Sequence, residues 1–217
     1  TEHNNLTHIS SLQRIFPDSY VWMDRFTMKN LELFTSNSLN GFNLSDTIDE
    51  TITSMGSRKL KSWIAFPLID KIEILKRQEI VQSIMSDDEI SRLLDINLNN
   101  ISDIERLMSK IATYKISPRE IVNLKSSLEN VDLIKDSLLV YSGVLKNYGK
   151  SLPSSKSIIR EISKTLKDDS PVSILKGDFI KDGFSKELDG LREIRSSGKE
   201  YLNQILERET KKTNIPS

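Results

Sequence analysis

Apolar side chains recur every three to four positions along most of this chain. Alternation of apolar and polar residues with a period of two, which is typical of a half-buried strand, is almost absent. Glycine and proline, with 8 and 6 residues, are scarce for 217 residues. We therefore predict an all-α, multi-helix fold. The runs that indicate helices are Ile90, Leu93 and Leu94; Ile104, Leu107, Met108 and Ile111; Ile121, Leu124 and Leu128; Val131, Ile134, Leu138 and Tyr141; and Ile158, Ile162 and Leu166.

Short polar patterns mark where several helices begin. The segment Ser117-Pro118-Arg119-Glu120 combines a serine N-cap, a proline at the first helical position and a glutamate at the third. Such a glutamate can bond back to the backbone of the cap and close a capping box. The same spacing occurs in two further pairs, Asp70 with Glu73 and Ser86 with Glu89. We expect a helix after each of them.

The last helix is predicted to be long and to project. Its pattern runs from near Ser185 to about Thr213, where Asn214 and Pro216 provide a stop. At 1.5 Å per residue it is roughly 40 Å long, which exceeds what a compact domain needs. Its apolar side chains form one face. This face consists of Leu188, Leu191, Ile194, Gly198, Leu202 and Ile205.

Two regions break the helical pattern. Residues 1–20 mix polar residues with Phe16-Pro17 and indicate a linker or a short extended piece. Residues 167–184 contain Pro171, Gly177 and Gly183 and are expected to form a loop with a short extended segment.

Charge and residue usage exclude several classes of function. Lysine plus arginine and aspartate plus glutamate each number 31, so the chain lacks the basic excess of a stand-alone nucleic-acid binder. There is no cysteine, and the only histidines are His3 and His8, so no thiolate or histidine cluster can build a metal site. A reducing compartment is indicated, and no apolar run is long enough to span a membrane. The start at Thr1 suggests a piece of something longer.

Three motifs suggest chemistry but favour structural explanations. The stretch GVLKNYGKS, from Gly143 to Ser151, resembles a phosphate-binding loop, but five residues instead of four separate its glycines, and a helix precedes it. We interpret Gly149 as a helix C-cap. The acidic pairs Asp87-Asp88 and Asp168-Asp169 fit helix starts or loops better than catalysis. The stretch ERETKKT, from Glu207 to Thr213, is typical of a solvated helix end, although a phosphate contact stays open.

The stretch MGSRKLKSWIAFPLID, from Met55 to Asp70, has two possible interpretations. Basic residues around a tryptophan could form a nucleic-acid patch. If the stretch is helical from Ser57, however, Trp63 lies on the apolar face, while the basic residues lie opposite. A stacking platform needs ring and charges on one surface, so we favour a core tryptophan in a buried helix that ends at Pro67. The apolar face consists of Leu60, Trp63, Ile64 and Pro67, and the polar face of Arg58, Lys59, Lys61 and Ser62.

Several segments, in order, resemble the core (lever) domain of the MutS family of DNA mismatch repair proteins. The resemblance covers nearly the whole chain from Tyr20 onward. Two positions depart from the family pattern: a Gly-Gly reads Gly177-Asp178, and a glycine reads Asn214. The matching positions are Asp24 and Asn30-Leu31-Glu32-Leu33; Gly56, Arg58, Leu60, Lys61, Trp63, Pro67, Leu68, Asp70, Ile74 and Arg77; Asp103, Glu105, Arg106, Leu107, Pro118, Arg119 and Leu124; and Gly183, Glu187-Leu188-Asp189, Arg192, Glu207, Arg208 and Glu209.

This resemblance implies a division of the chain and of its work. Residues 1–20 would be the tail of the preceding connector domain, and residues 21–217 the first limb of the lever, ending at the start of the DNA clamp. The family's mismatch-reading and ATPase domains and the returning limb would lie outside. Without the returning limb, the apolar face of the long helix should be exposed at its distal end or covered by another copy of the chain. We accordingly expect no catalytic, cofactor-binding or metal-binding residue here and no enzyme activity of this piece. The intact protein would use ATP and Mg²⁺.

The resemblance also implies partners. The intact protein would bind mismatched double-stranded DNA, form a homodimer, meet other mismatch repair proteins and work in the cytoplasm, away from membranes. A self-contained helical scaffold that binds a protein through the long helix is the alternative. A parent gene with an upstream Phe-x-Glu motif and a downstream GxxxxGK[ST] motif would favour the lever.

Overall fold

The computed structural model describes residues 19–213, and the predicted all-α fold is confirmed. Within these residues there is no strand, only two isolated antiparallel bridges, Tyr20 with Leu68 and Leu166 with Ile180. The helices are α1 (Arg25–Asn30), α2 (Leu44–Ile48), α3 (Ser54–Ala65), α4 (Lys71–Met85), α5 (Asp88–Asn99), α6 (Ile104–Ala112), α7 (Pro118–Val140), α8 (Gly143–Ser151), α9 (Lys156–Thr165), the short 3₁₀ turn η2 (Ile174–Lys176) and α10 (Lys186–Thr213).

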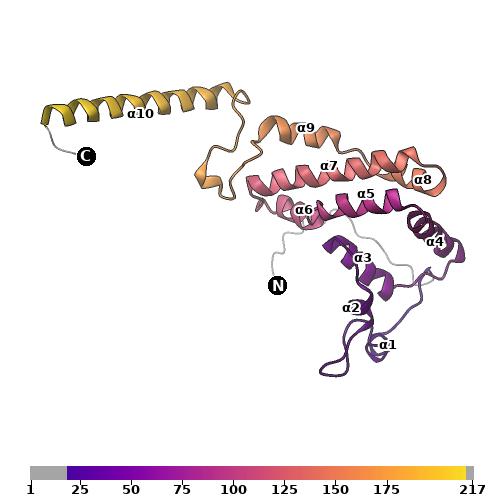
Figure 1. Ribbon diagram of the computed structural model, residues 1–217. Coiled ribbons are helices and arrows are strands. Elements are labelled where there is room, and N and C mark those ends of the chain that lie inside the picture. The colour runs from indigo at the N-terminus through magenta and orange to yellow at the C-terminus, as the bar shows by residue number, and fades with distance from the viewer. Residues whose placement is uncertain (1–18, 214–217) are drawn as a thin grey trace, which may run out of the picture.

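The core forms around α7, which packs against α5, α6, α8 and α9 (Figure 1). The apolar runs that begin at Ile121 and at Val131 belong to this one helix. Four buried side chains from three helices, Ile90, Ile134, Leu138 and Leu145, make the centre of the core, and α4 covers them from one end. The period of 3.6 residues places these side chains on facing stripes, which explains why the pattern predicted the core helices.

Of the three predicted capping boxes, one forms completely, one forms in part and one does not form. Ser117 forms the full capping box: its Oγ accepts from the backbone N–H of Glu120, whose carboxylate accepts from the N–H of Ser117. Asp70 caps α4 by accepting from the N–H of Ile72, but Glu73 pairs with Lys76 instead of closing a box.

The prediction for Ser86 was wrong. Ser86 is the C-cap of α4, where its hydroxyl donates to the carbonyl of Gln82. Asp87 is the N-cap of α5 and accepts from the N–H groups of Glu89 and Ile90. A carboxylate one residue closer to the helix accepts from both donors at once, so it outcompetes the serine hydroxyl.

Gly149 does not end a helix either. It lies inside α8, where it is buried against α7. Within α8, it is Gly143 at the start of the helix that has a left-handed backbone, with φ of 63°. As expected, the stretch from Gly143 to Ser151 is helical and follows a helix, so it is no phosphate-binding loop.

The first three helices form a small module beside the core (Figure 1). No residue of α3 is buried, and Trp63 is 39% exposed, so the prediction of a buried helix with a core tryptophan was wrong. The guanidinium of Arg77 from α4 lies 3.9 Å from the centre of the Trp63 ring and covers one face. A helix with the right apolar spacing is buried only where a neighbour covers it, and the core helices pack against one another instead.

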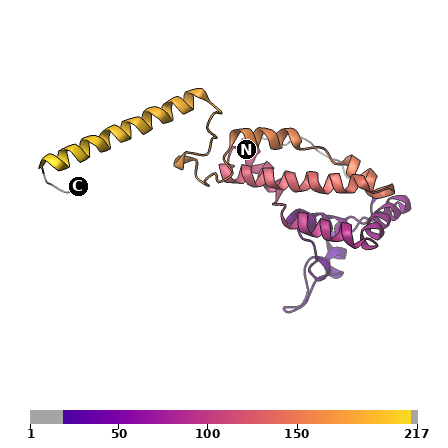
Figure 2. The same ribbon diagram turned by 45° about the horizontal axis from the view of Figure 1, so that its top comes forward.

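The long helix extends away from the core in both views (Figures 1 and 2). Its 28 residues, Lys186–Thr213, agree with the predicted bounds and with a length of roughly 42 Å. No helix packs extensively against it among the described residues. The predicted exposure of its apolar face at the distal end is confirmed for Leu202 and Ile205, and Leu191 and Ile194 nearer the core are exposed as well. The predicted stop at Asn214 and Pro216 lies outside the described residues.

Candidate functional site

The connection between α9 and α10 is bonded to both helices and to α7. Residues 167–184 form a loop, as predicted, and its extended segment is the bridge between Leu166 and Ile180. The N–H of Lys167 donates to the carbonyl of Phe179 over 2.9 Å, and the N–H of Lys181 donates to the carbonyl of Thr165 over 2.9 Å. The returning half of the loop is thereby fixed to the end of α9.

The turn of this loop depends on two residues with left-handed backbones. Gly177 has φ of 65° and Asp178 has φ of 56°. Aspartate is one of the few side chains that tolerates this conformation. Its carboxylate lies 2.6 Å from the Lys167 ammonium. That contact lowers the pKa of Asp178 and raises the pKa of Lys167. The departure from the family's Gly-Gly pattern therefore keeps the turn and adds an ion pair.

Arg192 joins the second turn of α10 to this loop. One terminal nitrogen lies 2.6 Å from the carboxylate of Asp182 and 3.3 Å from that of Asp189. The other donates to the carbonyl of Ile180 over 2.8 Å. Asp189 also accepts from the N–H of Gly183 over 2.8 Å. A guanidinium suits this position because its planar fork can bond a carboxylate and a carbonyl at once.

The other half of the loop is tied to α7. Lys125 is largely buried and lies 2.5 Å from the carboxylate of Asp168, whose pKa is lowered by that contact. Arg119 bonds two successive backbone carbonyls: its side chain reaches Ser170, and its N–H reaches Pro171. A continuous series of bonds therefore leads from α7 through the loop to α10, and we name it the α7–α10 junction.

A second arginine joins the small module to the core. The two terminal nitrogens of Arg58 in α3 donate to the two carboxylate oxygens of Asp103, over 2.9 and 2.7 Å. Its Nε donates to Glu105 over 2.8 Å. Both acidic residues lie at the start of α6, where carboxylates also complement the helix dipole. These bonds raise the pKa of Arg58 and lower that of Asp103. Arg58 therefore fastens α3 to α6.

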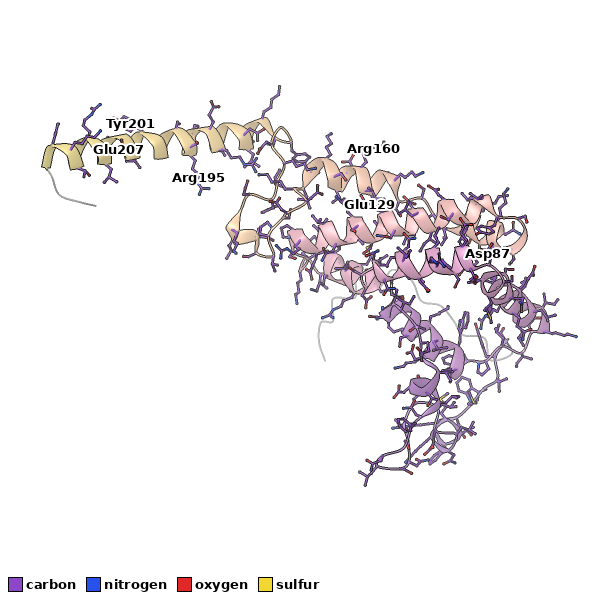
Figure 3. The ribbon with its side chains drawn as sticks, in the orientation of Figure 1. Asp87, Glu129, Arg160, Arg195, Tyr201 and Glu207 are labelled. Atoms are coloured by element: carbon purple, nitrogen blue, oxygen red, sulfur yellow. The ribbon has the colours of Figure 1, made fainter. Side chains whose placement is uncertain are left out.

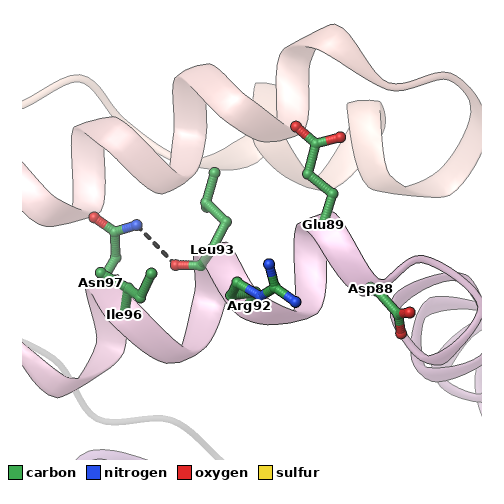
Figure 4. Close-up of a pocket in the computed structure, with 6 residues that line it drawn as sticks. All are labelled: Asp88, Glu89, Arg92, Leu93, Ile96 and Asn97. Atoms are coloured by element: carbon green, nitrogen blue, oxygen red, sulfur yellow. Dashed lines mark hydrogen bonds between the residues drawn. The ribbon is translucent and has the colours of Figure 1, made fainter.

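The hollows on the described surface do not resemble a cofactor site. One hollow of about 560 Å³ is lined by residues of α5 alone, so it is an open flank of one helix (Figure 4). These residues are Asp88, Glu89, Arg92, Leu93, Ile96 and Asn97. Among residues 19–213 no three acidic or histidine side chains gather as metal ligands. The residues present do not fit a nucleotide with its Mg²⁺. No helix in this part of the chain is long and apolar enough to cross a membrane.

Comparison with known proteins agrees with this architecture. A family model described as MutS domain III matches residues 26–214. The chain belongs to the MutS domain III family. DNA mismatch repair protein MutS of Christiangramia forsetii is 45% identical, that of Flavobacterium johnsoniae 46% and that of Bacteroides thetaiotaomicron 42%, each over all of this chain. The chain spans about a quarter of the length of these curated relatives.

The basic stretch from Met55 to Asp70 does not form a nucleic-acid surface in this MutS domain III chain. Arg58 is occupied by two carboxylates, and Trp63 is covered on one face by Arg77 of the next helix. The ring and the cation that covers it therefore come from different helices. Arg58, the one arginine of the stretch, is already paired with two carboxylates. The stretch does not present the combined stacking and phosphate surface that nucleic acid requires.

The junction was not predicted as a site. No catalytic, cofactor or metal residue was expected, and the residues that connect the domain III elements, Arg192 above all, were noted only as matches to the family. One signal could have found them. Asp189 and Arg192 have the i, i+3 spacing of a helical ion pair, and they lie at the start of the helix that follows Asp182-Gly183, a turn signal. The bonds to Ile180 and Ser170 involve backbone carbonyls, which no sequence pattern reveals.

Proposed function

We propose that this chain is a structural and allosteric lever within a DNA mismatch repair protein. One observation carries the proposal: in this MutS domain III chain, a helix of 28 residues is bonded to the loop before it through its first two turns. Residues far along this helix, including Tyr201 and Glu207, lie well away from the core (Figure 3). A rigid element fastened at one end turns a small rotation at its base into a large movement at its tip.

The size of that movement follows from the geometry. A helix of roughly 42 Å that rotates by about 10° at its base moves its tip by about 7 Å. The α7–α10 junction would carry such a rotation from α7, the best-packed helix, to α10. Rigid elements that rotate as bodies are a standard form of allosteric change.

The remaining activities are proposed for the intact protein and not for this piece. We assign residues 1–20 to the tail of a connector domain and residues 21–217 to the first limb of the lever. ATP with Mg²⁺ and mismatched double-stranded DNA would bind elsewhere in the parent, which would act as a homodimer with other mismatch repair proteins in the cytoplasm. The piece itself would be no enzyme.

Two measurements test this function. In the intact parent, labels at the positions of Glu129 on α7 and Glu207 on α10 should report a changed distance when ATP and mismatched duplex are added. An unchanged distance in every nucleotide and DNA state would contradict a lever. The isolated chain should neither shift a mismatched duplex in a gel nor hydrolyse ATP, and either activity would contradict the division of work.

The exposed face of α10 favours a second candidate function, a scaffold that binds a protein partner. Leu191, Ile194 and Leu202 are each more than half exposed. An extended apolar face on one helix is typical of helix-to-helix docking. The two functions differ in the parent: a scaffold would keep its Glu129–Glu207 distance when nucleotide and DNA are added.

A further inference from the structure

Polar contacts in the first two turns of α10 bond it to the loop before it. Arg192 and Asp189 bond back to Ile180, Asp182 and Gly183. Beyond them the helix meets no extensive packing within the described chain. The direction of the whole helix therefore depends on a few bonds at one end.

Gly183 lies between two rigid parts. On one side, Lys181 is held by its N–H to the carbonyl of Thr165 and by its ammonium to the carbonyl of Ser163, over 2.7 Å. On the other side α10 begins at Lys186. Gly183 has φ of 81°, and a Cβ built on it would meet no atom within 4 Å. Its backbone thus has a conformation that residues with a side chain rarely adopt, and glycine can change it at little cost.

Arg192 spans this glycine. It belongs to α10, while two of its partners, Ile180 and Asp182, belong to the loop before Gly183. While these bonds are made, rotation at Gly183 is blocked. The ion pair is also easy to release, because the side chain of Asp182 is more than three-quarters exposed. Exposed ion pairs are weak and are screened by salt.

We infer that Gly183 is the pivot of α10 and that Arg192 is a releasable latch that holds α10 in one direction. This device rests on the proposed lever function for its purpose, but it is a property of the chain by itself. Releasing the latch frees the angle between α10 and the core and leaves both parts folded. An anion or a partner's carboxylate that competes for Arg192 would have the same effect.

The absence of cysteine makes the test direct, since two introduced cysteines are the only label sites. Spin labels at Glu129→Cys and Glu207→Cys, both labelled in Figure 3, report the α7–α10 distance by double electron–electron resonance. This chain, with the two labels and no further substitution, should give one narrow distribution of distances. Arg192→Gln should broaden it about twofold, because the angle is then held only by the glycine-containing turn and the bond from the Gly183 N–H to Asp189. About 1 M NaCl, where the Debye length is about 3 Å, should broaden the distance distribution of the unsubstituted chain in the same way.

Matched variants separate the latch from general effects. Arg195→Gln removes the same charge one turn further along α10, where no hydrogen bond or ion pair is described, and should leave the distribution narrow. Asp182→Asn tests the latch from the exposed partner should Arg192→Gln fail to fold. Gly183→Ala should shift the mean distance, because alanine disfavours φ of 81°, whereas Gly190→Ala within α10 should not.

Two results would overturn the latch. One is a distribution as narrow in Arg192→Gln and Asp182→Asn as in Arg195→Gln. The other is a distance distribution of the unsubstituted chain that is already broad at low salt. Neither result bears on the lever, which is tested in the intact parent with ATP and DNA. Conversely, a static lever in the parent would leave the latch measured in this chain unaffected.

Discussion

Gly149 of α8 lies so close to Leu138 of α7 that a Cβ at position 149 would come within 2.9 Å of the Cβ of Leu138. The backbone of α7 at Leu138 and Leu139 is only 3.3 Å away, so a small rotation of a side chain cannot relieve the contact. We predict that Gly149→Ala destabilises the domain by about 1–3 kcal/mol, since overpacking outweighs the better helix propensity of alanine. Urea unfolding followed by circular dichroism measures the change.

Gly190→Ala is the matched control. Gly190 is also helical, but a Cβ there meets nothing within 4 Å. Alanine should therefore leave the domain as stable as before or raise the helicity of α10. Equal effects of the two substitutions would show that the α7–α8 contact is not as close as described.

This contact also shows where prediction from sequence stops. The spacing of apolar residues identified the core helices and α10, because amphipathic periodicity is a local property. The function of Gly149 depends on Leu138, eleven positions earlier, and local rules assigned it to a helix end. Trp63 shows the same limit: its spacing is that of a core residue, but burial depends on what covers the helix.

The α7–α10 junction was less predictable than the fold. Asp189 and Arg192 form a pattern that local rules recognise. Arg119 and Arg192, however, also bond the carbonyls of Ser170 and Ile180, which carry no residue-specific signal. Asp178 is similar, because its left-handed backbone, and not its side-chain type alone, aims its carboxylate at Lys167.

Ile90 should be the most costly single truncation in the core. It is 1% exposed and packs with Ile134, Leu138 and Leu145. Ile90→Ala removes buried methyl and methylene groups and leaves a cavity, so we expect a loss of roughly 2–5 kcal/mol in the free energy of unfolding. Leu191→Ala on α10, where the leucine is 59% exposed, should change it by less than about 0.5 kcal/mol. Thermal or urea unfolding of both variants compares the two sites, and similar losses would contradict the assigned core.

Arg58 should control how firmly the small module is attached. Arg58→Gln removes the fork onto Asp103 and the bonds to Glu105, so α3 and the start of α6 should open more often. Hydrogen exchange should become several-fold faster in these segments and stay unchanged in α7 and α8. Lys59→Gln, an exposed neighbour with no ion pair described in residues 19–213, is the control. Faster exchange throughout the core would instead indicate global destabilisation.

Glu120 should make stability depend on pH in acid. Lys110 and the N–H and hydroxyl of Ser117 all bond its carboxylate, with Lys110 as the largest cause, and they lower its pKa from 4.5 to about 2. A folded-state pKa below the unfolded one means that the stabilisation is complete above 4.5 and is lost as pH falls toward 2. At neutral pH, Glu120→Gln should cost about 1 kcal/mol, because the amide still caps the helix but the partly exposed ion pair is gone.

The difference in unfolding free energy between the unsubstituted chain and Glu120→Gln should therefore shrink as the pH falls from 4.5 to about 2, and it should level off below that, where both side chains are neutral. Comparing the two proteins at each pH cancels the titration of all other carboxylates. Glu129→Gln, an exposed substitution on the same helix, should show no such pH-dependent difference. A difference for Glu120→Gln that stays constant down to pH about 2 would mean that Lys110 and Ser117 do not stabilise the ionised form, and that only the shape of the side chain matters at this cap.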